Sequence, residues 1–144
     1  MKTSDLAMQY ELDWLKRWTL YAPNSMALTD GDSGHSFTYA ELFKQSLRGA
    51  TFLKNKYGIK KGDRVIHLST NETATFVLYF ALNRLGATLV PINYRLTARE
   101  LTYVITNAEA SVIVYEEAFK GRLLEIKNEI QVPEKNWLPL VGEN

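Results

Sequence analysis

Strand-like and helix-like segments alternate along most of this 144-residue chain, and that alternation constrains its fold more than any other feature. The apolar runs at 64–69, 87–92 and 111–115 are short and rich in β-branched residues, which is typical of buried strands. Amphipathic segments with helical periodicity lie between them. Alternation of this kind places parallel strands side by side with helices on both faces. We therefore predict an α/β fold with a parallel-stranded sheet flanked by helices.

Two elements are expected before the alternation begins. Apolar residues recur every four positions, at Leu6, Tyr10, Trp14 and Trp18. They predict an N-terminal amphipathic helix that ends before Pro23, and packing against the rest of the domain is favoured over a partner surface. The segments 26–29 and 36–37 flank a Gly- and Asp-rich stretch at 30–34, which predicts a β-hairpin.

Local signals mark where the later helices begin and end. Thr38–Glu41 and Thr97–Glu100 are capping boxes, in which the Thr side chain and the Glu carboxylate each accept a backbone N–H of the other residue. Gly58 and Gly86 predict helix ends in the left-handed conformation. Pro91 lacks a ladder donor, so it is expected at the end of its strand or on a sheet edge.

Two further helices are predicted from apolar residues alone. The segment up to Leu85 is apolar nearly all round, which predicts burial on more than one side, and Asn71 or Thr73 is expected to cap it. Apolar residues from Phe119 to Ile130 predict the other helix.

Composition excludes several classes of protein. Lys and Arg total 17 and Asp and Glu total 16, so a net charge of +1 argues against a nucleic-acid binder driven by bulk charge. The absence of Cys excludes Cys nucleophiles, thiolate metal sites and redox pairs. The sequence shows no secretory-signal pattern and no apolar stretch near the ~20 residues that span a bilayer. We expect a cytoplasmic protein, with peripheral contact at a membrane surface as an alternative.

The common motifs of catalytic and binding sites do not occur in the sequence. It lacks the dinucleotide fingerprint, the P-loop, the zinc-protease and EF-hand patterns and the nucleophile elbow. His67 is expected to hydrogen-bond to backbone within its strand, and His35 to be exposed at the hairpin turn. We therefore predict no catalytic, cofactor-binding or metal-binding residue in this chain.

A basic cluster follows the helix that Gly58 ends. Its members are Lys54, Lys56, Lys60, Lys61 and Arg64. Such a cluster could attract a phosphate or an acidic lipid surface. Cations also favour the negative pole at a helix C-terminus, and this local explanation is preferred.

Four blocks, in order, resemble the adenylate-forming (AMP-binding) acyl-CoA synthetases. They are Tyr21–Leu28, Phe37–Leu42, Gly58–Val65 and Gly86–Leu101. The longest is similar to the family's Gly-Ala-x-x-Val-Pro-Leu-Asn-x-Arg-Leu-Thr-x-x-Glu-Leu. Ala74 and Thr75 depart from the pattern, where the family commonly has Glu and a large apolar residue. The resemblance is to the N-terminal segment of a ligase of the long-chain fatty-acid–CoA type.

This resemblance implies that residues 1–144 are a single fragment from the front of the large N-terminal domain, with the phosphate loop and C-terminal domain absent. Such ligases join a carboxylate to Mg-ATP, form an acyl-adenylate, and pass the acyl group to coenzyme A. We expect a scaffold segment that is inactive alone and binds no cofactor, while the parent enzyme uses Mg-ATP and coenzyme A. Its implied partners are the rest of the ligase chain, a fatty acid, ATP and coenzyme A, with no nucleic acid. For Arg95, a salt bridge that holds its loop is favoured over substrate contact.

Two hypotheses from other classes stay open. One is a stand-alone flavodoxin-like binding module, which would enclose its ligand at the carboxyl ends of its strands. The other is a structural or partner-binding fragment that self-associates through an exposed last strand, from Trp137 onward.

Overall fold

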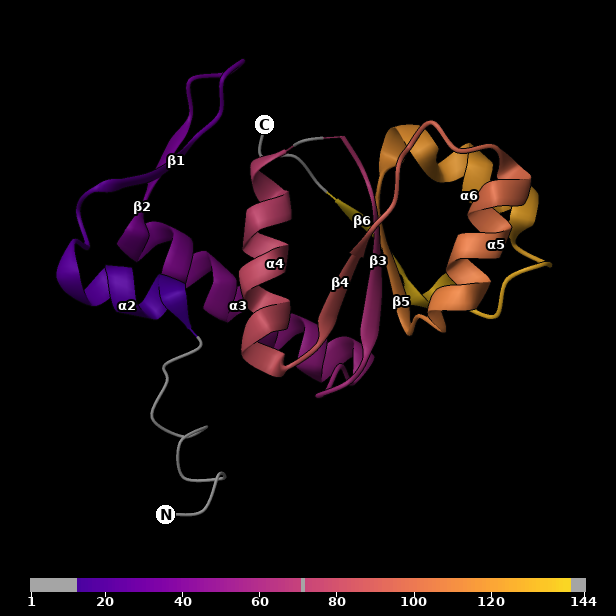
Figure 1. The fold of residues 1–144 in the computed structure, drawn as a ribbon, viewed down its shortest axis with the longest axis horizontal. Coiled ribbons are helices and arrows are strands. Elements are labelled where there is room, and N and C mark those ends of the chain that lie inside the picture. The colour runs from indigo at the N-terminus through magenta and orange to yellow at the C-terminus, as the bar shows by residue number, and fades with distance from the viewer. Residues whose placement is uncertain (1–12, 71, 141–144) are drawn as a thin grey trace, which may run out of the picture.

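The structure, a computed structural model, describes residues 13–70 and 72–140. The elements in chain order are α2 (Trp14–Tyr21), β1 (Met26–Thr29), β2 (Ser36–Thr38), α3 (Tyr39–Tyr57), β3 (Arg64–Leu68), α4 (Thr73–Leu85), β4 (Thr88–Pro91), α5 (Ala98–Ala108), β5 (Val112–Glu116), η1 (Glu117–Phe119), α6 (Lys120–Ile126), η2 (Glu134–Asn136) and β6 (Trp137–Leu140). The predicted α/β fold is confirmed, including the N-terminal helix and the antiparallel hairpin β1–β2. Figure 1 shows α3 and α4 on one side of the sheet and α5 and α6 on the other.

The main sheet is parallel throughout and has the order β4-β3-β5-β6. Alternate residues of each strand face opposite sides, as the two-residue period of a strand requires. Ile66 and Ile113 enter the core beneath α5 and α6, whereas Val65 and Val112 enter the core beneath α3 and α4. Pro91 is the last residue of the edge strand β4, as its missing N–H predicts.

The predicted capping boxes and glycine helix ends are confirmed by their hydrogen bonds and backbone angles. The Glu41 carboxylate accepts the Thr38 N–H at 2.8 Å, and the Thr38 hydroxyl accepts the Glu41 N–H at 3.2 Å. Thr97 and Glu100 form the second box in the same way. Gly58 and Gly86 end α3 and α4 in the left-handed region, with φ of 65° and 70°.

Of three expectations about the helices, two are wrong or partly wrong. The N-cap of α4 is Glu72, with no side-chain hydrogen bond, because Thr73 is already the first helical residue; Asn71 lies outside the described residues. One expectation, burial of α4 on more than one side, is confirmed, because α4 packs against both the sheet and α3; its remaining side is open, and Phe76 and Tyr79 there are 48% and 46% exposed. The last helix stops at Ile126, before the buried Ile130.

Packing of the aromatic stripe on α2 is also corrected. Leu15 is buried against Phe37 and Leu42, but Trp14 and Trp18 are 71% and 51% exposed. The side of α2 that faces the domain carries Leu15 and Thr19, which lie about 100° or more around the helix from Trp14. Leu6 and Tyr10 lie outside the described residues.

Candidate functional site

Strand β3 is the point at which the chain changes direction across the sheet. From β3 the chain passes through α4 to β4 on one side, and from β4 it passes through α5 to β5 on the other side of β3. The connections that leave the carboxyl ends of β3 and β5 therefore run to opposite faces (Figure 1). Ligands of open α/β sheets bind at such a topological switch point. A ligand-binding or catalytic site is therefore expected at this edge of the sheet.

A cluster of polar side chains occupies this position, and we call it the switch-point cluster. Its members are His67, Ser69, Thr70, Glu72, Thr75 and Glu116. Glu116, the last residue of β5, accepts the backbone N–H and the hydroxyl of Thr70, each at 2.9 Å, and the Ser69 hydroxyl at 3.3 Å. These bonds tie the loop after β3 to the neighbouring strand. They also lower the pKa of Glu116, the backbone N–H of Thr70 having the largest effect.

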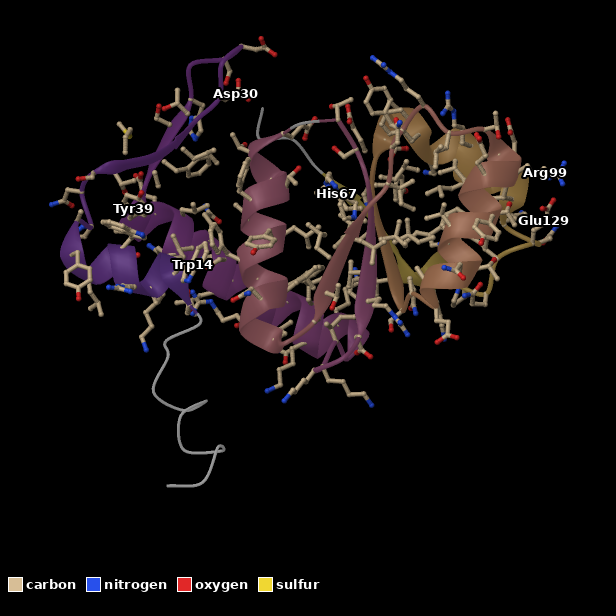
Figure 2. The ribbon with its side chains drawn as sticks, viewed as in Figure 1. Trp14, Asp30, Tyr39, His67, Arg99 and Glu129 are labelled. Carbon is tan, nitrogen blue, oxygen red and sulfur yellow. The ribbon has the colours of Figure 1, made fainter. Side chains whose placement is uncertain are left out.

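His67 is the most buried member of this cluster, at 4% exposed (Figure 2). Its Nε2 is 3.2 Å from the Thr75 hydroxyl on the first turns of α4. The expected bond to backbone is therefore replaced by a side-chain bond to the neighbouring helix, because His67 shares the α4-facing side of β3 with Val65. Burial lowers the pKa of His67, and the negative charge of Glu116 opposes that shift. The ring is thus held neutral near pH 7. His35 is exposed, as expected.

Glu72 adds a second carboxyl group beside the loop. Burial raises the pKa of Glu72, and the negative charges of Glu116 and Asp30 raise it further. A low Glu116 pKa next to a raised Glu72 pKa is the pattern of two carboxyl groups held in different environments. Such pairs occur at catalytic sites and also in structural hydrogen-bond networks.

The switch-point cluster does not fit the phosphates of ATP or coenzyme A. Its charged groups are the carboxyls of Glu72 and Glu116, which repel phosphate, and it contains no Lys or Arg. Within residues 13–70 and 72–140, no three His, Asp or Glu side chains come close enough to hold a metal ion. The hydroxyls of Ser69 and Thr70 are already bonded to Glu116. The cluster's role in this chain is therefore structural: it holds the loop after β3 against β5.

A second candidate is an open hollow over α5. It is lined by Leu96, Arg99, Glu100, Tyr103 and Val104. Of the two charged residues that line this hollow, Glu100 is already bonded to Thr97 in the capping box. Arg99 is therefore the one charged side chain of the lining that remains for a ligand. A binding pocket for a small ligand normally brings several polar groups together. This hollow does not.

Arg95 is expected to hold the loop after β4 through a salt bridge, but another arginine holds this loop. Arg95 is exposed, and its guanidinium carbon lies 5.5 Å from the ring centroid of Tyr94, with no ion pair among the described residues. Arg122 of α6 holds the loop instead, since its Nη1 donates to the carbonyls of Tyr94 and Leu96. Stacking of Tyr94 on Phe119, at 5.5 Å, supports the same contact.

From the sequence, His67 is named as a hydrogen-bonded strand residue and Thr75 only as a departure from the family pattern. Ser69, Thr70, Glu72 and Glu116 are not singled out there. A usable signal was present: Ser69-Thr70 and Glu116 directly follow or end two buried strands. Parallel strands bring their carboxyl ends to one edge. What the sequence does not show is that β3 and β5 are adjacent.

Comparison with known proteins agrees with this fold. A family model described as "AMP-binding enzyme" matches residues 15–140. A 2-succinylbenzoate–CoA ligase of Oceanobacillus iheyensis is 36% identical over 75% of this chain and 22% of its own length. A feruloyl-CoA synthase of Amycolatopsis is 35% identical over 71% of this chain and 20% of its own. The chain spans about a fifth of these curated relatives.

Solved structures resemble it over nearly its whole described length. A fatty acyl CoA synthetase of Mycobacterium tuberculosis superposes with a TM-score of 0.81 and 27% identity, covering 90% of this chain and 26% of that one. The N-terminal domain of FACL13 from the same organism superposes with a TM-score of 0.81 and 27% identity, and the match covers 90% of this chain and 34% of that domain. No helix among the described residues is both long and apolar enough to cross a membrane. This chain belongs to the AMP-binding enzyme family, and it has the fold found in the N-terminal domains of acyl-CoA synthetases.

Proposed function

We propose that this chain is the front portion of the N-terminal domain of an ATP-dependent CoA ligase, and that its role there is to scaffold the active site. The observation that carries the proposal is a mismatch of lengths. The family model matches residues 15–140, yet the chain spans only 22% and 20% of two curated relatives. The parent reaction would join a carboxylate to ATP, release pyrophosphate, and transfer the acyl group to coenzyme A.

The polar groups of the chain support a scaffolding role. Glu41 and Glu100 cap helices, and Glu116 holds the loop after β3. Arg122 holds the loop after β4. Each of these charges is committed to the backbone of this chain, so we infer that residues 1–144 alone do not catalyse adenylation. The acid that we propose for the parent enzyme is a fatty acid; the relatives' names include 2-succinylbenzoate and feruloyl ligases, which makes aryl acids the alternative.

The test compares this chain with a version extended by its downstream coding sequence. Each is incubated with Mg-ATP, coenzyme A and either a fatty acid or an aryl acid, and pyrophosphate release is measured. We expect release only from the extended protein and only with the fatty acid. Release by residues 1–144 would refute inactivity of the segment. An extended protein that uses only aryl acids would refute the fatty-acid assignment.

The sheet topology favours one alternative enough to test it. The order β4-β3-β5-β6 equals the first four strands of the flavodoxin-like order 2-1-3-4-5. A stand-alone binding module would use the switch point for its ligand. A flavin that stays with the purified protein, seen by its absorbance, would favour this alternative over the scaffold.

Self-association is a third proposal, carried by the edge strand β6. It pairs with β5 on one side, and no other described strand pairs with its second side. A free strand edge can pair with another copy. Sedimentation equilibrium of the chain before and after removal of residues from Trp137 onward tests this, because a dimer that survives the removal contradicts it.

A further inference from the structure

The cations of this chain are concentrated in one region. Residues 39–64 hold seven of the 17 Lys and Arg but only two of the 16 Asp and Glu, a net of +5, so the remaining residues carry a net of −4. We call the seven cations the basic face: they are Lys44, Arg48, Lys54, Lys56, Lys60, Lys61 and Arg64. All seven are exposed. Figure 2 shows nitrogen-tipped side chains gathered along the edge where α3 ends and β3 begins.

The two carboxylates in this region do little to neutralise the basic face. Glu41 is bonded to Thr38 in the capping box, and Asp63 accepts the backbone N–H of Lys60 at 2.8 Å. Among the described residues, the basic face forms one ion pair, between Arg64 and Glu109 at 3.1 Å. The helix dipole accounts for Lys54 and Lys56, which lie in the last turn of α3. It does not account for Lys44 and Arg48, which lie six or more residues before Lys54.

Apolar side chains are exposed among these cations. Leu47 and Phe52 are 41% and 43% exposed. Lys44 and Arg48 lie on the outer side of α3, opposite the buried Ala50 and Leu53. Leu47 and Phe52 flank these two cations on either side, about 140° apart around the helix. The Lys56 Nζ lies 5.3 Å from the ring centroid of Phe52.

We propose that the basic face and the exposed Leu47 and Phe52 together dock on an anionic lipid bilayer. A helix face that mixes Lys and Arg with Phe and Leu is the pattern of interfacial binding, since the apolar groups enter the headgroup boundary while the cations meet anionic lipid. Five of the seven cations are Lys, whose flexible point charges suit a fluid layer of headgroups. They lie along α3 and the loop after it and do not converge on one phosphate. The proposal does not depend on the ligase assignment.

Co-sedimentation of the protein with lipid vesicles tests the proposal. Vesicles of phosphatidylcholine alone are compared with vesicles that also contain phosphatidylserine. We expect binding only to the vesicles that contain phosphatidylserine. This binding should be lost when ionic strength rises from about 0.1 M to about 1 M, because the Debye length falls from ~10 Å to ~3 Å. Equal binding to both vesicles would overturn the proposal.

Matched variants locate the contact. Lys56→Gln with Lys60→Gln removes two charges from the basic face, and Lys127→Gln with Lys135→Gln removes two exposed charges elsewhere. Each lysine near an anionic membrane surface contributes about 5-fold to the affinity. The first double substitution should therefore weaken vesicle binding roughly 20- to 30-fold, and the second double substitution much less. Equal weakening by the two pairs would show that net charge alone acts, and would overturn the assigned face.

A third variant separates lipid from other polyanions. Because the Phe52 ring is proposed to enter the bilayer, Phe52→Ser should weaken vesicle binding. Circular dichroism checks that this variant is folded. If Phe52→Ser is unfolded, Leu47→Ser is used in its place. A short DNA duplex is the competing probe. Tighter binding to the duplex than to anionic vesicles, with no effect of either apolar substitution, would assign the face to nucleic acid and overturn the lipid proposal.

Discussion

The carboxylate of Glu116, at the end of β5, accepts the backbone N–H of Thr70, just after β3, at 2.9 Å. The two residues are 46 positions apart in the chain. They meet because β3 and β5 are neighbours in the sheet, although β4 lies between them in sequence. The bond ties down the loop at the switch point, which is the edge where proteins of this topology commonly bind ligands.

Substitution of Glu116 tests how much this loop depends on one charge. Glu116→Gln replaces a charged acceptor with a weaker neutral one for the Thr70 N–H, the Thr70 hydroxyl and the Ser69 hydroxyl. We expect a loss of about 1 kcal/mol in the free energy of unfolding, below the ~1.5–3 typical of bonds to charged groups because the site is partly exposed. Denaturant titration measures it. Glu117→Gln, which breaks only an exposed pair with Lys120, is the control and should cost less than ~0.5 kcal/mol.

The buried His67 predicts a pH dependence of stability. Because burial lowers its pKa below the ordinary 6.5, the unfolded chain binds a proton that the folded chain does not. Stability is therefore highest above that value and falls as pH decreases through it. The low Glu116 pKa acts in the same direction, but only near and below its ordinary value of 4.5.

Unfolding free energies measured at about pH 7.5 and about pH 5.5 test this prediction, because Glu116 stays ionised in that window and the raised pKa of Glu72 would act in the opposite direction. The wild-type protein is expected to lose stability on acidification, and His67→Gln to lose markedly less. An unchanged pH dependence in His67→Gln would contradict the assignment.

The two glycines that end α3 and α4 should differ in their tolerance of a side chain. Both have positive φ, so Ala at either costs about 1–2 kcal/mol. Nothing lies within 4 Å of a Cβ at Gly58, whereas at Gly86 it would meet the Lys61 Cγ at 3.1 Å and Cβ at 3.3 Å. Gly86→Ala should therefore be the more destabilising in thermal unfolding. The reverse order would show that Lys61 moves aside freely.

Arg122 is predicted to control the loop after β4. Arg122→Ala removes the donor to the Tyr94 and Leu96 carbonyls, and we expect a loss of about 1 kcal/mol. Hydrogen exchange at the Arg95 and Leu96 amides should accelerate. Arg95→Ala, which removes only an exposed contact with the Tyr94 ring, should leave that exchange nearly unchanged. Acceleration in Arg95→Ala alone would restore the role first expected of Arg95.

The sequence by itself determined the local features of this protein, because those depend on neighbouring residues. Thr38 with Glu41 and Thr97 with Glu100 act across three positions, Gly58 acts on its own backbone, and Pro91 lacks its own N–H. The strand–helix alternation set the fold class in the same way, and the four motif blocks indicated the family.

Tertiary structure decided which distant residues meet. The strand order brought Glu116 to Thr70, and α6 brought Arg122 to the loop of Arg95. It also decided which apolar faces stay open: α4 touches the sheet and α3 but leaves Phe76 and Tyr79 exposed, and α3 turns Phe52 outward among the lysines. Periodicity shows that a helix has an apolar side, but only the packing of other elements determines how much of that side is covered.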